Sequence, residues 1–175
     1  MSTIFDTEYY PTPLNVVMKR AVVDLFKVFT SYDKKNTNHT EGWKTNSNYK
    51  VNKRVILPDF VDSKWSNHYS YTNRYSAYND IDKVMCYLSG VSYDTMTALQ
   101  RGNYYVKRLT KEEEQKVSLI SAVGDVLVGD NSWRESRFFR FRCFKKGTVH
   151  IEFKDEELWA KFNKAVNDCV SLGYF

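Results

Sequence analysis

The stretch RFFRFRCFKKGTVHIEF, residues 137–153, has the pattern of a β-hairpin with two chemically different faces. A three-residue connection, Lys145-Lys146-Gly147, places glycine where a left-handed backbone conformation is needed. This loop length pairs Phe144 with Thr148 and sets the register of every pair beyond them. A two-residue loop would place arginines opposite aliphatic residues and mix the two faces, so the pattern favours the three-residue loop.

This register predicts one apolar face and one polar face. The apolar face is expected to pair Phe139 with Phe153, Phe141 with Ile151, and Cys143 with Val149. On the other face Arg142 is expected opposite His150, and Arg140 opposite Glu152. Directly opposed side chains of an antiparallel pair are about 5 Å apart. We therefore expect these four polar residues to form one cluster.

The composition indicates a folded protein with a mild and uneven basic excess. A chain of 175 residues can form one domain, residues 1–175, with a hydrophobic core of its own. The 26 Lys and Arg residues exceed the 21 Asp and Glu residues only slightly, for a net charge of +5. Residues 134–146, however, hold six basic residues and one acidic residue. Such a local excess is typical of a phosphate-binding surface.

The cysteines and the charge pattern predict a cytoplasmic protein. The 3 cysteines are far apart and lack metal-ligand spacing, which predicts neither a disulfide framework nor a zinc site. Charged residues interrupt the apolar positions of residues 14–29, so neither a signal peptide nor a membrane span is expected. We also expect no metal and no small-molecule cofactor.

Apolar spacing and capping residues predict the remaining elements. Five helices are expected, over residues 13–29, 80–90, 93–101, 110–129 and 155–169. Strands are expected over residues 51–57 and 104–109, and a long mobile loop over residues 30–50. Together these elements predict an α+β fold, with helices packed on a small antiparallel sheet. The first and last helices are expected to cover the apolar face of the hairpin.

Three segments resemble proteins of phages and plasmids. Residues 10–13, YPTP, resemble the opening of N6-adenine DNA methyltransferases of mobile elements. Residues 141–163, FRCFKKGTVHIEFKDEELWAKFN, resemble the uncharacterised domain often fused behind those enzymes, and residues 79–90 look like an upstream helix of that domain. The chain lacks the Asn/Asp-Pro-Pro-aromatic tetrapeptide and the glycine-rich turn of the enzymes. The resemblance therefore implies the accessory domain standing alone and excludes a methyltransferase.

A small, basic protein of this kind is similar to anti-defence proteins of phages, including streptococcal anti-CRISPR inhibitors that act on guide RNA. The resemblance implies a nucleic-acid partner, with RNA favoured, and a host CRISPR effector nuclease as protein partner in the bacterial cytoplasm. Two alternatives remain open. One is a non-catalytic inhibitor that occupies the nucleic-acid groove of a nuclease, and the other is an accessory domain of a DNA methyltransferase system.

The polar face of the hairpin contains the groups that a metal-independent endoribonuclease needs. Such an enzyme uses a general base, a general acid and cations that hold the phosphate in the transition state. We hypothesise that Glu152 is the base and His150 the acid, with Arg140 and Arg142 as the phosphate clamp. The alternatives are binding without catalysis, or a solvated exterior whose ion pairs contribute about 0.2 to 1 kcal/mol each.

Further residues are expected to bind nucleic acid around this cluster. The expected phosphate contacts are Arg134, Arg137, Lys145, Lys146 and Lys154. In the aromatic segment 65–78, Arg74, Tyr71 and Tyr75 suit the stacking of unpaired bases, although such rings can also cover a small core.

A metal-dependent nuclease is a further alternative. Glu152 and Lys154 have acid-x-Lys spacing, with Asp130 as the second carboxylate that a magnesium site would need.

Overall fold

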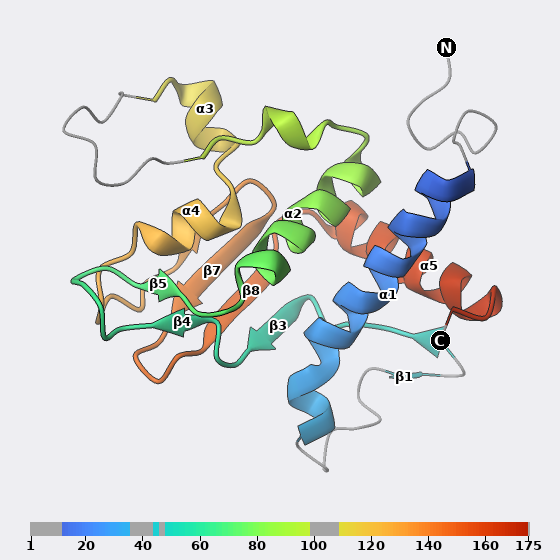
Figure 1. The fold of residues 1–175 in the computed structure, drawn as a ribbon, viewed down its shortest axis with the longest axis horizontal. Helices are drawn as coiled ribbons and strands as arrows, with labels where there is room; N and C mark the ends of the chain where they lie inside the picture. Colours follow the sequence, from blue (N-terminus) through green and yellow to red (C-terminus); the bar gives the residue numbers. More distant parts are fainter. Residues whose placement is uncertain (1–11, 36–43, 46–47, 99–108, 175) are drawn as a thin grey trace.

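The computed structural model describes residues 12–35, 44–45, 48–98 and 109–174. Helices and antiparallel strands share one hydrophobic core, which confirms the predicted α+β class (Figure 1). The predicted strand over residues 104–109 lies outside the described residues, except for Leu109, which is not in a strand.

The central sheet has four antiparallel strands in the order β3-β8-β7-β6. These strands are β3 (Arg54–Leu57), β6 (Arg134–Glu135), β7 (Phe139–Cys143) and β8 (Val149–Phe153). Two strand pairs lie outside it: β1 (Lys44–Thr45) with β2 (Asn48–Tyr49), and β4 (Val61–Asp62) with β5 (Ser70–Tyr71). The hairpin β7-β8 is therefore the centre of the sheet, with β3 on one side and β6 on the other.

The hairpin has the predicted loop and register. The Phe144 N–H donates to the Thr148 carbonyl at 2.9 Å, and the Gly147 N–H donates to the Phe144 carbonyl at 2.9 Å. Gly147 has a φ of 103°, the left-handed conformation that the three-residue loop requires. All five predicted pairs, from Phe139 with Phe153 to Cys143 with Val149, are present.

The helices are α1 (Thr12–Lys35), α2 (Tyr75–Ser89), α3 (Lys111–Gln115), α4 (Leu119–Gly124) and α5 (Glu156–Ser171), with a 3-10 turn η2 (Tyr93–Thr95). None of the described helices is long and apolar enough to cross a membrane.

The predicted loop over residues 30–50 is wrong at its start and near its end. Helix α1 continues to Lys35. Thr30 inside it is buried, and its hydroxyl is satisfied within the helix by donating to the Phe26 carbonyl at 2.8 Å. Near the other end of the segment, β1 and β2 form a short antiparallel pair. Residues 36–43 and 46–47 lie outside the described residues.

The predicted helix over residues 110–129 is two helices. A capping box of Thr110 and Glu113 starts α3 at the predicted place, but the chain leaves the helix before Val117. Thr97 forms backbone hydrogen bonds with the residues between the two helices. Its N–H donates to the Lys116 carbonyl at 2.8 Å, and its carbonyl accepts from the Ser118 N–H at 2.9 Å. The same pairing explains why the predicted helix 93–101 ends at Thr95.

Helix α2 begins five residues earlier than predicted, at Tyr75. Tyr78 is fully buried in its first turn, and its hydroxyl donates to the Phe60 carbonyl at 2.7 Å. This contact fixes the start of α2 against the segment between β3 and β4, a constraint with no local signature in the sequence.

The core lies between one face of the sheet and the helices. The six inward residues of β7 and β8 are at most 1% exposed. Phe29 of α1 and Phe162 of α5 pack on Phe153, with ring centroids 6.3 and 6.2 Å from it. The predicted cover by the first and last helices is confirmed, and α2 and α4 extend it (Figure 1). The opposite face of the sheet is left without a helix among the described elements.

Candidate nucleic-acid interface

The side chains that point away from the core form what we call the polar face of the sheet. Pairing across the four strands places Arg54, Glu152, Arg140 and Glu135 in one row. Glu152 Oε2 is 3.3 Å from Arg54 Nη2 and 4.0 Å from Arg140 Nη2. Glu152 is therefore shared by two arginines from the neighbouring strands.

A second row contains the predicted acid. His150 lies between Arg142 and Ile56 on the adjacent strands, and its ring centroid is 4.7 Å from that of Phe144. Arg142 also lies over Phe144, at 5.0 Å. The structure thus brings together all four predicted catalytic residues, in the predicted pairs.

Trp133 organises the arginines of this face. The guanidinium carbons of Arg54, Arg140 and Arg142 lie 5.1, 4.4 and 5.3 Å from the centre of the Trp133 ring. The Nε atoms of Arg140 and Arg142 are buried and have no hydrogen-bond partner. Among the described residues, Arg142 also has no carboxylate within ion-pair distance. Three cations thus gather around one ring, with their donors only partly used.

Sequence reasoning missed Arg54 and Trp133. Alternation in β3 places Arg54 on the face opposite Val55 and Leu57, which was visible in the sequence. The sequence did not show that β3 pairs with β8. This pairing places Arg54 opposite Glu152, which is 98 residues further along the chain. Trp133 carries no comparable signal, because β6 is only two residues long.

The electrostatic environment of His150 opposes the proposed acid role. Burial lowers the pKa of His150 below 6.5, and the charges of Arg142, Arg54 and Lys146 lower it further. A general acid must carry its proton at the working pH, and the imidazole is neutral at pH 7 under these conditions. Glu152 is already engaged by two guanidinium groups, Arg54 at 3.3 Å and Arg140 at 4.0 Å. The geometry therefore favours anion binding over proton transfer, and catalysis stays a hypothesis.

Some of the predicted phosphate contacts border the polar face. Lys154 Nζ lies 3.5 Å from Glu135 Oε2 and donates to the Ser136 carbonyl at 3.1 Å. Lys145 and Lys146 are exposed in the hairpin turn. These lysines extend the positive charge beyond the arginines.

Arg134 and Arg137 are not on this face. Arg134 pairs with Phe141, whose side chain points into the core, and its guanidinium is 3.5 Å from Asp125 and 3.8 Å from Asp130. Arg137 donates from Nη1 to Thr95 Oγ1 at 2.8 Å, on the helical side of the sheet. Their predicted role at the hairpin cluster is therefore not supported by their positions.

The metal-dependent alternative finds no centre in the described part of the chain. Asp130 accepts from the Ser132 N–H at 2.9 Å and pairs with Arg134, whereas Glu152 pairs with Arg54 and Arg140. Within residues 12–35, 44–45, 48–98 and 109–174, no three His, Cys, Asp or Glu residues are grouped as a metal ion requires.

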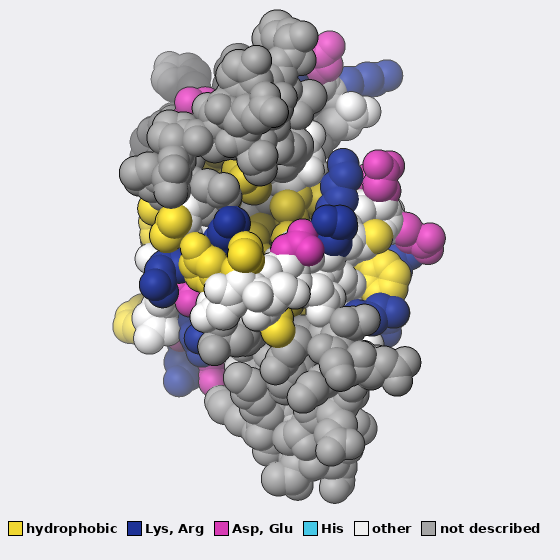
Figure 2. All heavy atoms as spheres, turned by 90° about the vertical axis from the view of Figure 1, so that its right-hand side faces the viewer, with side chains coloured by type: hydrophobic (Ala, Val, Ile, Leu, Met, Phe, Trp, Pro, Cys, Tyr) yellow, Lys and Arg dark blue, Asp and Glu magenta, His cyan; other side chains and the backbone are white. Residues whose placement is uncertain are grey.

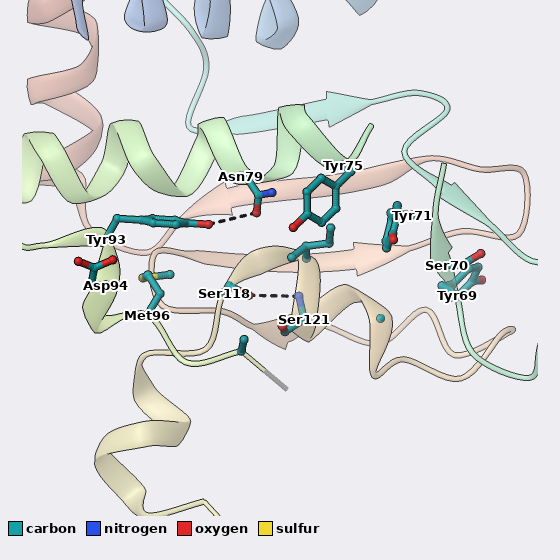
Figure 3. A pocket seen from close by; sticks show the side chains of 13 residues that line it. Tyr69, Ser70, Tyr71, Tyr75, Asn79, Tyr93, Asp94, Met96, Ser118 and Ser121 are labelled. Carbon is teal, nitrogen blue, oxygen red and sulfur yellow. Dashed lines mark hydrogen bonds between the residues drawn. The ribbon is translucent and has the colours of Figure 1, made fainter. Parts of the chain in front are cut away.

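Tyr71 and Tyr75 line a separate pocket of about 480 Å³, formed by β5, α2, η2 and α4 (Figure 3). None of the polar-face residues lines it. Arg74 does not line it either, because its guanidinium turns to the Phe60 ring at 5.5 Å. The predicted base-stacking residues are therefore on a different surface from the hairpin cluster.

Basic residues are not clustered everywhere on the molecule. Figure 2 shows the end at which α1 and α5 pack, where the Lys and Arg side chains lie among hydrophobic, uncharged and acidic ones. The polar face differs, because its arginines converge on one aromatic ring.

The fold and this face define an α+β protein with an arginine-rich, open sheet surface. The sequence matches the family described as Domain of unknown function (DUF4942) over residues 9–170, so the chain belongs to that family. No curated protein and no solved structure matches it.

Proposed function

We propose that the protein binds single-stranded nucleic acid, with RNA favoured, through the polar face of its sheet, and that it does so without cleaving the strand. The observation that carries the proposal is the convergence of Arg54, Arg140 and Arg142 on Trp133. Like charges held this close repel one another, and a bound anion removes that cost. The arginine fork also matches the geometry of a phosphate group.

The charge balance of the face supports an anionic ligand. Five cations, Arg54, Arg140, Arg142, Lys146 and Lys154, stand against two carboxylates, Glu135 and Glu152, for a net charge of +3. The unpartnered Nε donors of Arg140 and Arg142 are directed at no acceptor of the protein itself. Because these Nε atoms are buried, a phosphate oxygen would meet the exposed parts of the guanidinium groups instead; the Arg140 side chain is 41% exposed.

The aromatic and guanidinium planes favour an unpaired strand. Bases that are not in a duplex can stack on indole rings and on arginine planes, with about 1 to 3 kcal/mol per base. Trp133 and Phe144 each lie against arginines on this face. The preference for RNA, and a guide RNA of a host defence nuclease as the natural target, follow from the resemblance to phage anti-defence proteins and are part of this proposal.

The test measures binding of labelled single-stranded RNA, single-stranded DNA and duplex DNA by fluorescence anisotropy over a range of salt concentrations. Arg142→Ala is expected to weaken binding of single-stranded RNA about tenfold and to reduce the salt slope by about one contact. Arg134→Ala removes the same group off the face and serves as the matched control, with little change expected. Equal affinities and slopes for the wild type and the Arg142 variant would refute the proposal.

Gel analysis of the same RNAs addresses the catalytic alternative. Full-length RNA after incubation, with or without chelator, is expected if the protein only binds. Cleavage that survives chelator and disappears in both His150→Ala and Glu152→Gln would instead establish these residues as catalytic.

A further inference from the structure

A second site is built from tyrosines on the helical side of the molecule. The pocket of about 480 Å³ is in the size range of small-molecule sites. We call it the tyrosine pocket, and the lining residues that matter here are Tyr69, Tyr71, Tyr75, Tyr93, Asn79 and Asp94. It does not share a residue with the polar face, so its ligand is a separate question from the proposed function.

The rings of Tyr71 and Tyr75 are exposed in a way that core packing does not explain. They are 51% and 54% exposed, and their centroids lie 5.4 Å apart at an angle of 53°. Tyr69, by contrast, is 1% exposed and forms part of the core. Two adjacent half-exposed rings at the mouth of a pocket offer flat apolar area to a planar ligand.

The polar groups of the pocket suit the edge of a heterocyclic base. The Tyr93 hydroxyl donates to Asn79 Oδ1 at 3.1 Å, and this bond orients the amide. Figure 3 shows the amide nitrogen of Asn79 on the side of Tyr75. The amide nitrogen is a donor, while the Tyr93 oxygen keeps lone pairs that accept. A heterocyclic ring that carries donors and acceptors on its edge can therefore hydrogen-bond to the Asn79 amide nitrogen and to the Tyr93 oxygen.

The charge of the pocket argues against a phosphate. Among the lining residues that the structure describes there is no Lys or Arg, and the one charged side chain is the exposed Asp94. A phosphate beside Asp94 would meet a carboxylate. Lys83 and Arg137 contact two lining residues, Tyr93 at 5.4 Å and Met96 at 3.4 Å, but do not themselves line the pocket. A tetraalkylammonium group, for its part, has no N–H to donate to the Tyr93 oxygen and no lone pair to accept from the Asn79 amide.

We propose that the tyrosine pocket binds an uncharged nucleoside, a purine in preference to a pyrimidine, with the base against Tyr75 and Tyr71 and its edge toward Asn79. A purine is favoured because its larger ring system stacks more strongly on tyrosine. The sugar lies toward solvent near Asp94, so a 5′-phosphate weakens the complex.

The test is calorimetric titration of the full chain with adenosine, guanosine, cytidine and uridine, with the corresponding 5′-monophosphates, and with choline. A purine nucleoside is expected to bind most tightly. Its monophosphate is expected to bind about fivefold more weakly, the effect of a doubly charged phosphate about 8 Å from one carboxylate in a water-like medium. The proposal is overturned if no nucleoside binds, if the monophosphate binds as well as the nucleoside, or if choline alone binds.

Variants assign the site. Tyr75→Ala is expected to weaken purine nucleoside binding about tenfold, and its exposed position leaves the fold intact, which the urea midpoint checks. Arg134→Ala, on neither the polar face nor the tyrosine pocket, is the control that keeps nucleoside binding unchanged. Unchanged affinity in the Tyr75 variant would show that the nucleoside binds elsewhere and would refute this proposal. That result is independent of the RNA-binding measurements, which test the polar face.

Discussion

Replacing Asp82 with asparagine tests the energetics of the most deeply buried carboxyl group that the structure describes. Asp82 lies on α2, is 1% exposed, and accepts from the Leu119 N–H at 2.8 Å through Oδ2, while Oδ1 has no partner. Burial raises the pKa of Asp82 from 3.8 to about 7, opposed by the Leu119 hydrogen bond and the charge of Arg137. Cys86 on the same helix and Tyr93 are its other titratable neighbours.

The sign of the pH effect follows from the raised pKa. A carboxyl group that holds its proton more tightly in the folded state stabilises the fold most below the unfolded pKa, and this stability is lost as pH rises through 7. From pH 5 to the folded pKa of about 7 the pH rises by about two units, and above 7 little more stability is lost. The free energy of unfolding therefore falls by about 2 to 3 kcal/mol between pH 5 and pH 8.5. Asparagine stays neutral throughout and keeps an acceptor for Leu119, so the variant is free of this loss.

Urea denaturation of the wild type and Asp82→Asn at pH 5 and pH 8.5 gives the measurement. The stability of the wild type relative to the variant is expected to fall by about 2 to 3 kcal/mol between the two pH values. Any cost of the amide geometry is the same at both pH values and cancels. Asp94→Asn, an exposed carboxylate, is the control and is expected to show no such change. An equal difference at both pH values for Asp82→Asn would refute the reasoning.

Two further predictions concern contacts that hold the hairpin and α2 in place. Tyr78→Phe removes the hydroxyl that donates to the Phe60 carbonyl at 2.7 Å, so the free energy of unfolding is expected to fall by about 1 to 3 kcal/mol in urea denaturation. The exposed Tyr71→Phe is its control, and equal losses in the two variants would contradict the buried bond's importance. Gly147→Ala places a Cβ 3.2 Å from the Val61 carbonyl oxygen at a φ of 103° and is expected to lower the thermal midpoint, at a cost of about 1 to 3 kcal/mol. A midpoint equal to that of the wild type would show that the turn relaxes freely.

The parts that sequence reasoning predicted are those in which neighbouring residues decide the outcome. The hairpin register depends on a short loop and on alternation, so the pairs Arg140 with Glu152 and Arg142 with His150 are confirmed. The start of α5 after its N-cap Asp155 and the end of α2 at the left-handed Gly90 are likewise set by local residues, and both agree with the predicted helix bounds.

The errors arise where distant segments compete with local preference. The helix predicted over residues 110–129 is interrupted because Thr97 takes the backbone groups of Lys116 and Ser118, which an isolated helix would use internally. The positions of Arg134 and Arg137 differ from the prediction because carboxylates and a hydroxyl from other segments hold them.

By itself the sequence determined a two-faced hairpin, with an apolar side for the core and Arg140, Arg142, His150 and Glu152 on the other side. Alternation along a strand and the length of a turn are sufficient for that. Only the tertiary structure decided what surrounds those four residues. Arg54 and Trp133 reach the face through strand pairing that is set by the packing of the whole sheet, and this packing turns a row of charges into a cluster of three arginines on one ring.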